Sequence, residues 1–381
     1  MKWLFYSGIF LLILFEAANV YFIMPIPGSQ QMDSLPLAYF LFSWRWIFRG
    51  LFLVMIILGL KDAWKKSKFL ALPVLLLAGY LVWNVNYKMA ADHMFLQTTQ
   101  VIMKDAKSNI IDETRLVVGI EYNGEARAYP IQFLGYHHKV FDTIGGVPIM
   151  VTYCTVCRSG RVFQPTVNGK TETFRLVGMD HFNAMFEDKT TRSWWRQENG
   201  EAVAGPLKGN TLPEWPCTQT SLKTWLQWHP SSLIMQPDTN FREEYEDESD
   251  FEVGRLEGRL TVYDTASWHD KSWIAGVTIG ETSKAYDWNQ LTRMKLIHDV
   301  IENQPILILV SDNNRNLTGL RRISHDQQFE MKGDTITDGT NSYKFNGQSL
   351  NEGVKDLDRI TVYQEYWHSW RTFHPSTFRY E

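Results

Sequence analysis

Two cysteines separated by two residues, Cys154 and Cys157, carry the clearest chemical signal in the chain. Together with His137 they offer two thiolates and one imidazole, a soft ligand set suited to Cu(I), or to Zn(II) with a fourth position left open. The same cysteines can instead act as a thiol/disulfide couple, or they can form a structural disulfide or remain inert thiols. A lone C-x-x-C leaves these alternatives open, because secure structural zinc sites show two such pairs.

A second copy of the surrounding sequence favours a site function for these three residues. The sequence around Tyr129 recurs around Tyr286, at a constant offset of 157 residues. In the second copy, other residues stand opposite the three candidates: Met294, Ser311 and Asn314. If the cysteines only filled core volume, both copies would be expected to keep small apolar residues there. Because the three candidates are lost together, we expect them to form one site that binds a copper or zinc ion or exchanges electrons.

Other polar residues near the cysteines in sequence are candidates for the same pocket: His138, Arg158, His181, Asp188, Trp195 and Gln197. Arg158 would favour a neighbouring thiolate over the thiol. His181 can complete a ligand set, although an ordinary surface histidine is the alternative. The motif from Asp188 to Gly205 is explained equally by residues that stabilise a turn around a packed tryptophan. Loops of this kind also line the sites of β-rich folds, so the pocket role stays open.

Both copies predict a β-rich α+β fold. Each begins with alternating strand-like sequence and continues into a short helical segment and a buried strand, and Asn123-Gly124 marks a tight hairpin turn in the first copy. The copies also end alike, at Trp225–Pro230 and Trp370–Pro375. We therefore expect two duplicated domains behind a membrane anchor. The expected regions are a transmembrane anchor at 1–91, a first repeat with the C-x-x-C at 92–235, an acidic linker at 236–272 and a degenerate second repeat at 273–381.

Three apolar segments make up the expected anchor, at about 3–24, 37–60 and 69–87. A helix of about 20 apolar residues covers the hydrocarbon core of a bilayer. A cleaved signal peptide would explain the first segment alone. The two further segments and the absence of an A-x-A-like cleavage site favour a retained three-helix, multi-pass anchor.

Lysines predict the orientation of this anchor. Lys2 precedes the first segment, and four lysines lie between the second and third: Lys61, Lys65, Lys66 and Lys68. The 25–36 loop carries only Asp33. Because basic residues favour cytoplasmic loops, we expect the amino terminus and the 61–68 loop to face the cytoplasm. The protein would then lie in the inner (cytoplasmic) membrane, with its large C-terminal region extracytoplasmic, in the periplasm.

Charged residues inside the apolar segments need partners, because an unpaired charge in the membrane is costly. Glu16 and Arg45 each lie eight residues from the outer ends of their segments, so equal depth predicts an ion pair between them. Arg49 is a second base in the same segment. Static helix packing is the simpler explanation for the pair, and a proton or ion path is the alternative.

The charge of the chain argues against nucleic acid as a partner. Residues 1–91 hold 8 of the 38 Lys and Arg and 3 of the 42 Asp and Glu, so the remainder carries a formal charge of -9. Nucleic-acid binding demands a basic surface. Membrane lipid is the expected surrounding partner of the anchor. Three cysteines are too few for a disulfide scaffold in so large an external region.

The external region resembles the DUF3179 family, a group of bacterial and archaeal proteins of unknown function. Three spaced motifs carry the resemblance in order: Gly145-Gly146-Val147-Pro148, Val151-Thr152-Tyr153-Cys154-x-x-Cys157-x-Ser159-Gly160 with Phe163, and Asp188-x-x-Thr191-x-Ser193-x-Trp195-x-Gln197-x-x-Gly200-x-Ala202-x-x-Gly205. The resemblance implies that His137 occupies the position of a family histidine. It also implies an acidic neighbour to that histidine, where this chain has His138-Lys139, so a glutamate acting there as general base is not supported.

Two function classes follow from these observations. The first is a membrane-anchored extracytoplasmic protein with a metal or thiol-redox site, with or without catalysis. The second is a non-catalytic interaction module, or a subunit of a membrane protein complex, in which the cysteines form a structural disulfide. The joint loss of His137, Cys154 and Cys157 in the second copy favours the first class.

Overall fold

The computed structural model describes residues 1–247, 251–252 and 260–381, which form two compact units. The first unit contains Met1–Leu96, Glu172–Arg196 and Gly200–Thr211, and the second contains Gln97–Thr171, Gln197–Asn199 and Leu212–Glu381. These units differ from the regions expected from sequence, because part of the first repeat groups with the amino-terminal helices. The expected acidic linker at 236–272 lies partly outside the described residues. Its described part contains η3 (Thr239–Phe241) and α8 (Arg242–Asp247).

Helices make up the amino-terminal part of the first unit. They are α1 (Lys2–Tyr21), η1 (Ser29–Gln31), α2 (Leu35–Ser43), α3 (Arg45–Lys66), α4 (Lys68–Trp83), η2 (Asn84–Lys88) and α5 (Ala91–Met94). Among the described residues, Lys2–Tyr21 and Lys68–Lys88 are long and apolar enough to cross a membrane. Helices α2 and α3 form a third candidate when taken as one span, with a bend of 60° between them.

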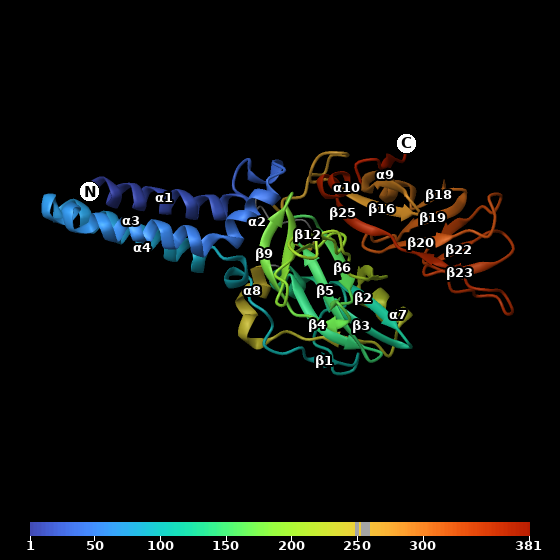
Figure 1. The fold of residues 1–381 in the computed structure, drawn as a ribbon. Helices are drawn as coiled ribbons and strands as arrows, with labels where there is room; N and C mark the ends of the chain where they lie inside the picture. Colours follow the sequence, from blue (N-terminus) through green and yellow to red (C-terminus); the bar gives the residue numbers. More distant parts are fainter. Residues whose placement is uncertain (248–250, 253–259) are drawn as a thin grey trace. The chain divides into compact units, whose positions relative to one another are not determined.

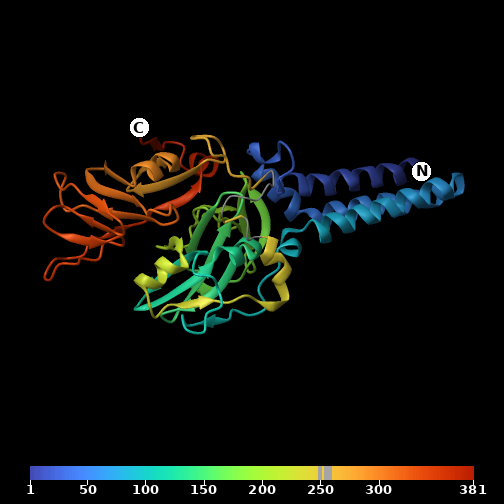
Figure 2. The same ribbon diagram turned by 180° about the vertical axis from the view of Figure 1, so that it is seen from behind.

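Small residues let the long helices pack closely. Figures 1 and 2 show α1 lying beside α3 and α4. At Gly59 of α3, an added Cβ would lie 2.3 Å from the backbone nitrogen of Phe5, so only glycine permits this approach. Ala63, Ala71 and Ala78 are buried in the same core. Close backbone approach through small residues is the usual basis of helix packing in membranes.

A four-stranded antiparallel sheet completes the first unit, in the order β12 (Ala202–Ala204), β11 (Trp194–Arg196), β10 (Asn183–Asp188) and β9 (Phe174–Asp180). It packs on the helix ends through a core that includes Ala38, Val177 and Trp194. Gly178 allows the backbone of β9 to touch the chain after α1, where Met179 N–H donates a hydrogen bond of 2.7 Å to the carbonyl of Ile23. The sheet and the helices therefore form one core.

The first half of the second unit contains two further sheets. One has the order β1 (Met103–Lys104), β15 (Leu233–Met235), β3 (Glu125–Pro130), β2 (Leu116–Tyr122) and β14 (Thr218–Ser221). The other has the order β13 (Glu214–Trp215), β6 (Ser159–Phe163), β5 (Val147–Cys154) and β4 (Lys139–Ile144). The remaining elements are α6 (Ile131–His137), α7 (Leu222–Trp228) and the ribbon of β7 (Thr166–Val167) and β8 (Lys170–Thr171). The expected hairpin at Asn123-Gly124 joins β2 to β3, with both residues at positive φ.

The second half of this unit has a similar series of elements. One sheet has the order β25 (Tyr363–Tyr366), β16 (Trp273–Ile279), β17 (Thr282–Asp287) and β26 (Phe378–Arg379). Another has the order β18 (Leu296–Ile301), β19 (Gln304–Val310), β20 (Leu317–Arg321) and β24 (Arg359–Ile360). A small sheet contains β21 (Glu330–Lys332), β22 (Thr335–Thr337) and β23 (Ser342–Lys344), and the helices are α9 (Trp288–Met294) and α10 (Trp367–Phe373). The described chain is thus a β-rich α+β protein with apolar helices at its amino terminus.

A tryptophan packs against a strand glycine in each half of the second unit. A Cβ at Gly119 would lie 2.4 Å from the ring of Trp225, and a Cβ at Gly276 would lie 2.3 Å from the ring of Trp370. Both rings are buried. The indoles of α7 and α10 therefore pack directly against the glycine backbone of their sheets, which fixes each short helix on its sheet.

We predict that Gly119→Ala destabilises the protein by about 1–3 kcal/mol, because the new methyl group collides with the Trp225 ring. The measurement is thermal unfolding of the purified full-length chain in detergent. Gly124→Asn is the control, since nothing lies within 4 Å of a Cβ there and asparagine tolerates its φ of 78°. Unfolding of Gly119→Ala at the wild-type temperature would contradict the close packing.

Candidate dithiol site

The C-x-x-C motif forms the turn between two buried, antiparallel strands. Strand β5 ends at Cys154 and β6 begins at Ser159, and these two residues face each other in the strand register. Both cysteine side chains are completely buried, and their thiols are hydrogen-bond partners. The turn brings the two sulfurs together because Arg158, the residue after the motif, adopts a left-handed φ of 59° and reverses the chain.

A histidine from the far end of the sequence meets this pair. Strand β25 reaches the turn through a backbone hydrogen bond of 2.9 Å, donated by Tyr366 N–H to the carbonyl of Cys157. Helix α10 begins directly after β25, which places His368 in its first turn. The imidazole lies close enough to the Cys157 thiol to lower its pKa, and its Nδ1 lies 3.0 Å from the carbonyl oxygen of Asp270.

A lysine adds positive charge to the same place. Lys271 Nζ donates a hydrogen bond of 2.6 Å to the carbonyl of Val156, inside the C-x-x-C turn. Burial lowers the pKa of Lys271 to about 8, against the opposing effect of the nearby cysteines. The ammonium group also lies 4.7 Å from the centre of the Tyr366 ring. A partly buried cation next to two thiols favours their charged, nucleophilic form.

The environment of Cys157 determines its acidity. Burial raises the pKa of Cys157 well above its usual value, and the hydrogen bond with Cys154 raises the pKa further. His368 acts in the opposite direction and lowers the pKa of Cys157. The thiol is therefore the resting form, and His368 is the group beside Cys157 that promotes thiolate formation.

Two of the expected pocket residues hold the turn in place. Arg158 is buried with its guanidinium 3.5 Å from the centre of the Trp273 ring, and its Nη1 donates a hydrogen bond of 2.5 Å to Gln364. The amide of Gln197 accepts a hydrogen bond of 2.9 Å from Ser159 Oγ and donates one of 3.1 Å to Thr152 Oγ1. Both residues support the strands that carry the cysteines.

The expected ligand His137 has a different hydrogen-bond partner. It ends α6, and its Nε2 lies 2.6 Å from the hydroxyl of Tyr245 on α8. Its neighbour His138 is also buried, and burial lowers the pKa of His138 to about 4, so this imidazole is neutral. Within the described residues, no group of three or more His, Cys, Asp or Glu side chains is placed to hold a metal ion. The three-ligand site with His137 thus stays a prediction.

Other expected pocket residues belong to the first compact unit. His181 lies in the turn between β9 and β10, where its Nδ1 is 2.7 Å from Asp180 Oδ1, and this contact raises the pKa of the histidine. Asp188 accepts hydrogen bonds from the backbone of the following turn and from the indole of Trp195, the latter at 2.9 Å. Asp188 and Trp195 therefore organise a turn, as the alternative explanation of their motif predicted.

Glu16, in the first apolar helix, pairs with a different arginine from the one expected. Glu16 binds Arg49, at 2.6 Å from Nε and 2.9 Å from Nη2, and Asn86 Nδ2 donates to the same carboxylate at 2.8 Å. The expected Glu16 and Arg45 pair is wrong, because equal depth assumed one straight helix over 37–60. The chain instead bends by 60° at Trp44, which places Arg45 at the start of α3.

A family model described as "Protein of unknown function (DUF3179)" matches residues 96–377, most of the chain. The chain belongs to the DUF3179 family. This confirms the resemblance that the spaced motifs predicted. Comparisons with curated proteins and with solved structures return no match. The function of this DUF3179 protein therefore has to be argued from its own side chains.

His368 and Lys271 are the site residues that sequence analysis missed. Both lie more than 100 positions beyond the cysteines, in or next to a copy that lacks the C-x-x-C. One signal was present in the sequence: at the offset of 145 residues that aligns Trp225 with Trp370, His368 stands opposite Lys223, so the histidine is specific to the second copy.

We predict that His368→Gln slows alkylation of Cys157 severalfold at neutral pH, because the amide cannot accept the thiol proton and the pKa of Cys157 rises. The rate of reaction with iodoacetamide would be measured against pH in a Cys217→Ser background. His325→Gln, at an exposed histidine, is the matched control. An unchanged pH profile in His368→Gln would show that the imidazole does not act on Cys157.

Proposed function

We propose that this DUF3179 protein is a membrane-anchored thiol–disulfide redox protein in which Cys154 and Cys157 are the redox couple and His368 is their acid–base group. The observation that carries this proposal is the contact of two buried thiols with each other and with an imidazole. All three cysteines lie within the described residues, and none of them is in a disulfide. The structure thus corresponds to the dithiol form of the couple.

The hydrogen bonds of His368 suit a role as proton acceptor. A carbonyl oxygen can only accept, so the contact of 3.0 Å with Asp270 requires the proton of the neutral ring to sit on Nδ1. That leaves Nε2 with a lone pair for the thiol proton of Cys157. Once protonated, the imidazolium stabilises the thiolate by its charge, and the ammonium of Lys271 adds to this effect.

The proposed reaction balances with a disulfide as the oxidant, either on a second protein or on a small thiol compound. The Cys157 thiolate attacks one sulfur of R–S–S–R, which forms a mixed disulfide and releases R–S⁻ as R–SH after protonation. Cys154 then loses its proton and attacks the Cys157 sulfur, which releases the second R–SH. The two cysteines lose two electrons and two protons, and R–S–S–R gains them.

Burial controls when this exchange takes place. Neither sulfur is exposed to solvent, so a bulky partner reaches Cys157 only after a local opening at the start of α10 or in the turn. The high pKa of the closed state keeps the thiols unreactive meanwhile. This arrangement favours selective exchange with a docked partner over random oxidation.

A soft metal ion remains the second candidate occupant of the site. Thiolates match the ligand preference of Cu(I) and of Zn(II), but no group of three ligands among the described residues is placed for a metal ion, so the remaining ligands would have to come from elsewhere. A structural disulfide in a non-catalytic interaction module is the third possibility for the pair. A redox titration and elemental analysis together distinguish all three.

We also propose that the second unit arose by duplication, with the copies arranged head to head. The Cys157 turn accepts a hydrogen bond from Tyr366 in the other half, and the corresponding turn of the second copy accepts one in return. There, Asn316 Oδ1 accepts hydrogen bonds from Ser221 N–H at 2.9 Å and from Thr220 Oγ1 at 2.8 Å. Ser221 aligns with Tyr366 at the offset of 145, so the two contacts are reciprocal.

We predict that Cys154 and Cys157 form a disulfide reversibly, with a two-electron midpoint potential above the value of about −300 mV below which structural disulfides lie. The full-length chain in detergent, with Cys217→Ser, would be equilibrated in glutathione buffers and its thiols counted by alkylation and mass spectrometry. His368→Gln should shift the potential, while His325→Gln should not.

Other outcomes overturn the redox proposal. A disulfide that glutathione cannot reduce would support the structural alternative. One copper or zinc ion per chain, found by elemental analysis and lost in Cys154→Ser, would support a metal site. Ser311 occupies the corresponding position in the second copy, so Cys154→Ser is expected to fold.

We further propose that the helices cross the inner membrane three times, with α2 and α3 as one bent span, and that the DUF3179 region is extracytoplasmic. The supporting observations are the two long apolar helices, the apolar sequences of α2 and α3, and the lysines between α3 and α4. An oxidising compartment outside the cytoplasm also suits a thiol–disulfide couple.

The topology predicts the labelling of introduced cysteines by an impermeant maleimide in a Cys217→Ser background. Lys355→Cys, at a highly exposed position, should react in intact cells. Lys65→Cys, at the end of α3, should react only after the membrane is permeabilised. The opposite pattern would reverse the orientation, and labelling of both positions in intact cells would exclude an odd number of spans between them.

A further inference from the structure

A cavity of about 590 Å³ lies in the first compact unit, between the ends of the helices and the sheet of β9 and β10. Helix α1 ends there at Tyr21, α3 begins there at Arg45, and η2 ends there at Lys88. Exposed aromatic side chains occur on the same helix ends: Trp44, Trp46, Trp83 and Tyr87. Aromatic residues of this kind concentrate at membrane–water interfaces, so with the membrane spans proposed above the cavity would lie at the depth of lipid headgroups.

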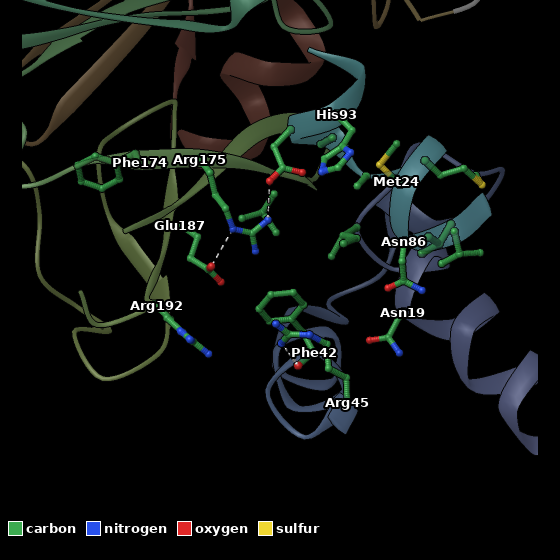
Figure 3. Close-up of a pocket in the computed structure, with 18 of the residues that line it drawn as sticks. Asn19, Met24, Phe42, Arg45, Asn86, His93, Phe174, Arg175, Glu187 and Arg192 are labelled. Carbon is green, nitrogen blue, oxygen red and sulfur yellow. Dashed lines mark hydrogen bonds and ion pairs between the residues drawn. The ribbon is translucent and has the colours of Figure 1, made fainter. Parts of the chain in front are cut away.

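Basic residues predominate in the cavity wall. Five basic side chains, Arg45, Arg49, Arg175, Lys189 and Arg192, face two acidic ones, Asp92 and Glu187. Figure 3 shows Arg45, Arg175 and Arg192 around one space.

Most of the positive charge in the cavity is not balanced by the protein. Arg175 binds both acids, at 3.2 Å from Asp92 and 2.8 Å from Glu187, and Arg49 is bound to Glu16. Within the part of the chain that the structure describes, no carboxylate forms an ion pair with Arg45, Lys189 or Arg192. These three cations therefore favour an anion in the cavity.

The arginines are close enough to share one ligand. Arg49, Arg175 and Arg192 all act electrostatically on Arg45, and the guanidinium of Arg45 lies 3.7 Å from the centre of the Phe42 ring. Bringing like charges together beside an apolar layer is unfavourable unless an anion offsets them. Arginine forks match the several oxygens of a phosphate group.

An apolar groove of about 440 Å³ adjoins the basic cavity on the helix surface. The two share Val20, Val85 and Met89 as wall residues. The rest of the groove is formed by the outward face of α1 and the chain after it, including Leu14, Ala17 and Phe22. A basic cavity that continues into an apolar groove has the shape of a site for an amphiphile.

We propose that this site binds an anionic membrane phospholipid, with its phosphate among Arg45, Lys189 and Arg192 and an acyl chain along the groove of α1 and η2. A free phosphate ion would use the cavity alone and leave the groove without a role. The groove, the position at headgroup depth and the excess positive charge together favour the lipid. The site lies in the first compact unit and does not depend on the redox proposal for the second.

Lipid binding would be measured by native mass spectrometry of the full-length protein in detergent, titrated with phosphatidylglycerol, phosphatidylcholine or inorganic phosphate. Phosphatidylglycerol should bind most tightly. Arg192→Gln and Lys189→Gln should each weaken its binding about tenfold, because each removes a charge-assisted hydrogen bond. Lys208→Gln, which removes an exposed lysine of the same unit outside the cavity wall, should leave binding unchanged.

A groove variant separates a lipid from a free anion. Ala17→Trp fills the apolar groove without a change of charge, so it should weaken phosphatidylglycerol and leave inorganic phosphate unaffected. Equal affinity for inorganic phosphate and phosphatidylglycerol, with no effect of Ala17→Trp, would assign the cavity to a free anion and overturn the lipid proposal. Unchanged phosphatidylglycerol binding in both Arg192→Gln and Lys189→Gln would overturn the site itself, and circular dichroism would confirm that each variant is folded.

Discussion

A buried guanidinium joins the two halves of the second unit, and the dithiol site depends on it. Arg161 on β6 is almost completely buried and binds Glu365 on β25, Glu198 Oε1 at 3.1 Å and the carbonyl oxygen of Glu198 at 2.9 Å. Its guanidinium also lies 3.8 Å from the centre of the Tyr363 ring. Removing one partner of a buried ion pair leaves the other charge without compensation, which typically costs about 3–5 kcal/mol. The contact between β6 and β25 is therefore strongly maintained once it has formed.

The contact between β6 and β25 fixes the position of His368, because His368 lies only three residues after Glu365. Glu365 lies on β25, Tyr366 next to it binds the carbonyl of Cys157, and His368 comes two residues later in the first turn of α10. Over so few residues the imidazole has little freedom to move away from the thiols. The buried ion pair thus has a chemical consequence, because it places the His368 imidazole from one half beside the thiols of the other.

Local features of this protein could be predicted from sequence, and contacts over long sequence separations could not. The alternating strands around Asn123-Gly124 and the closeness of Cys154 to Cys157 follow from patterns within a few residues. His137 was expected at the site because it precedes the cysteines by a short segment, but α6 directs its hydrogen bond to Tyr245. His368 comes 211 residues after Cys157, and no local pattern relates the two. In the amino-terminal helices, the wrong Arg45 prediction has a related origin: the position of Arg45 along a helix was counted as if the chain were straight, but it bends at Trp44.

The two halves of the second unit use the same kind of contact with different groups. In the first half, the turn after the buried strand carries two thiols and meets a histidine. In the second, the corresponding turn carries Ser311, whose hydroxyl lies 2.6 Å from Asn313 Oδ1, and Asn316, whose amide oxygen binds the start of α7. Hydroxyl and amide groups satisfy buried backbone donors without reacting, so this turn can only hold the halves together. In the first half the same contact places thiols beside an imidazole, so the redox chemistry proposed above belongs to the first turn.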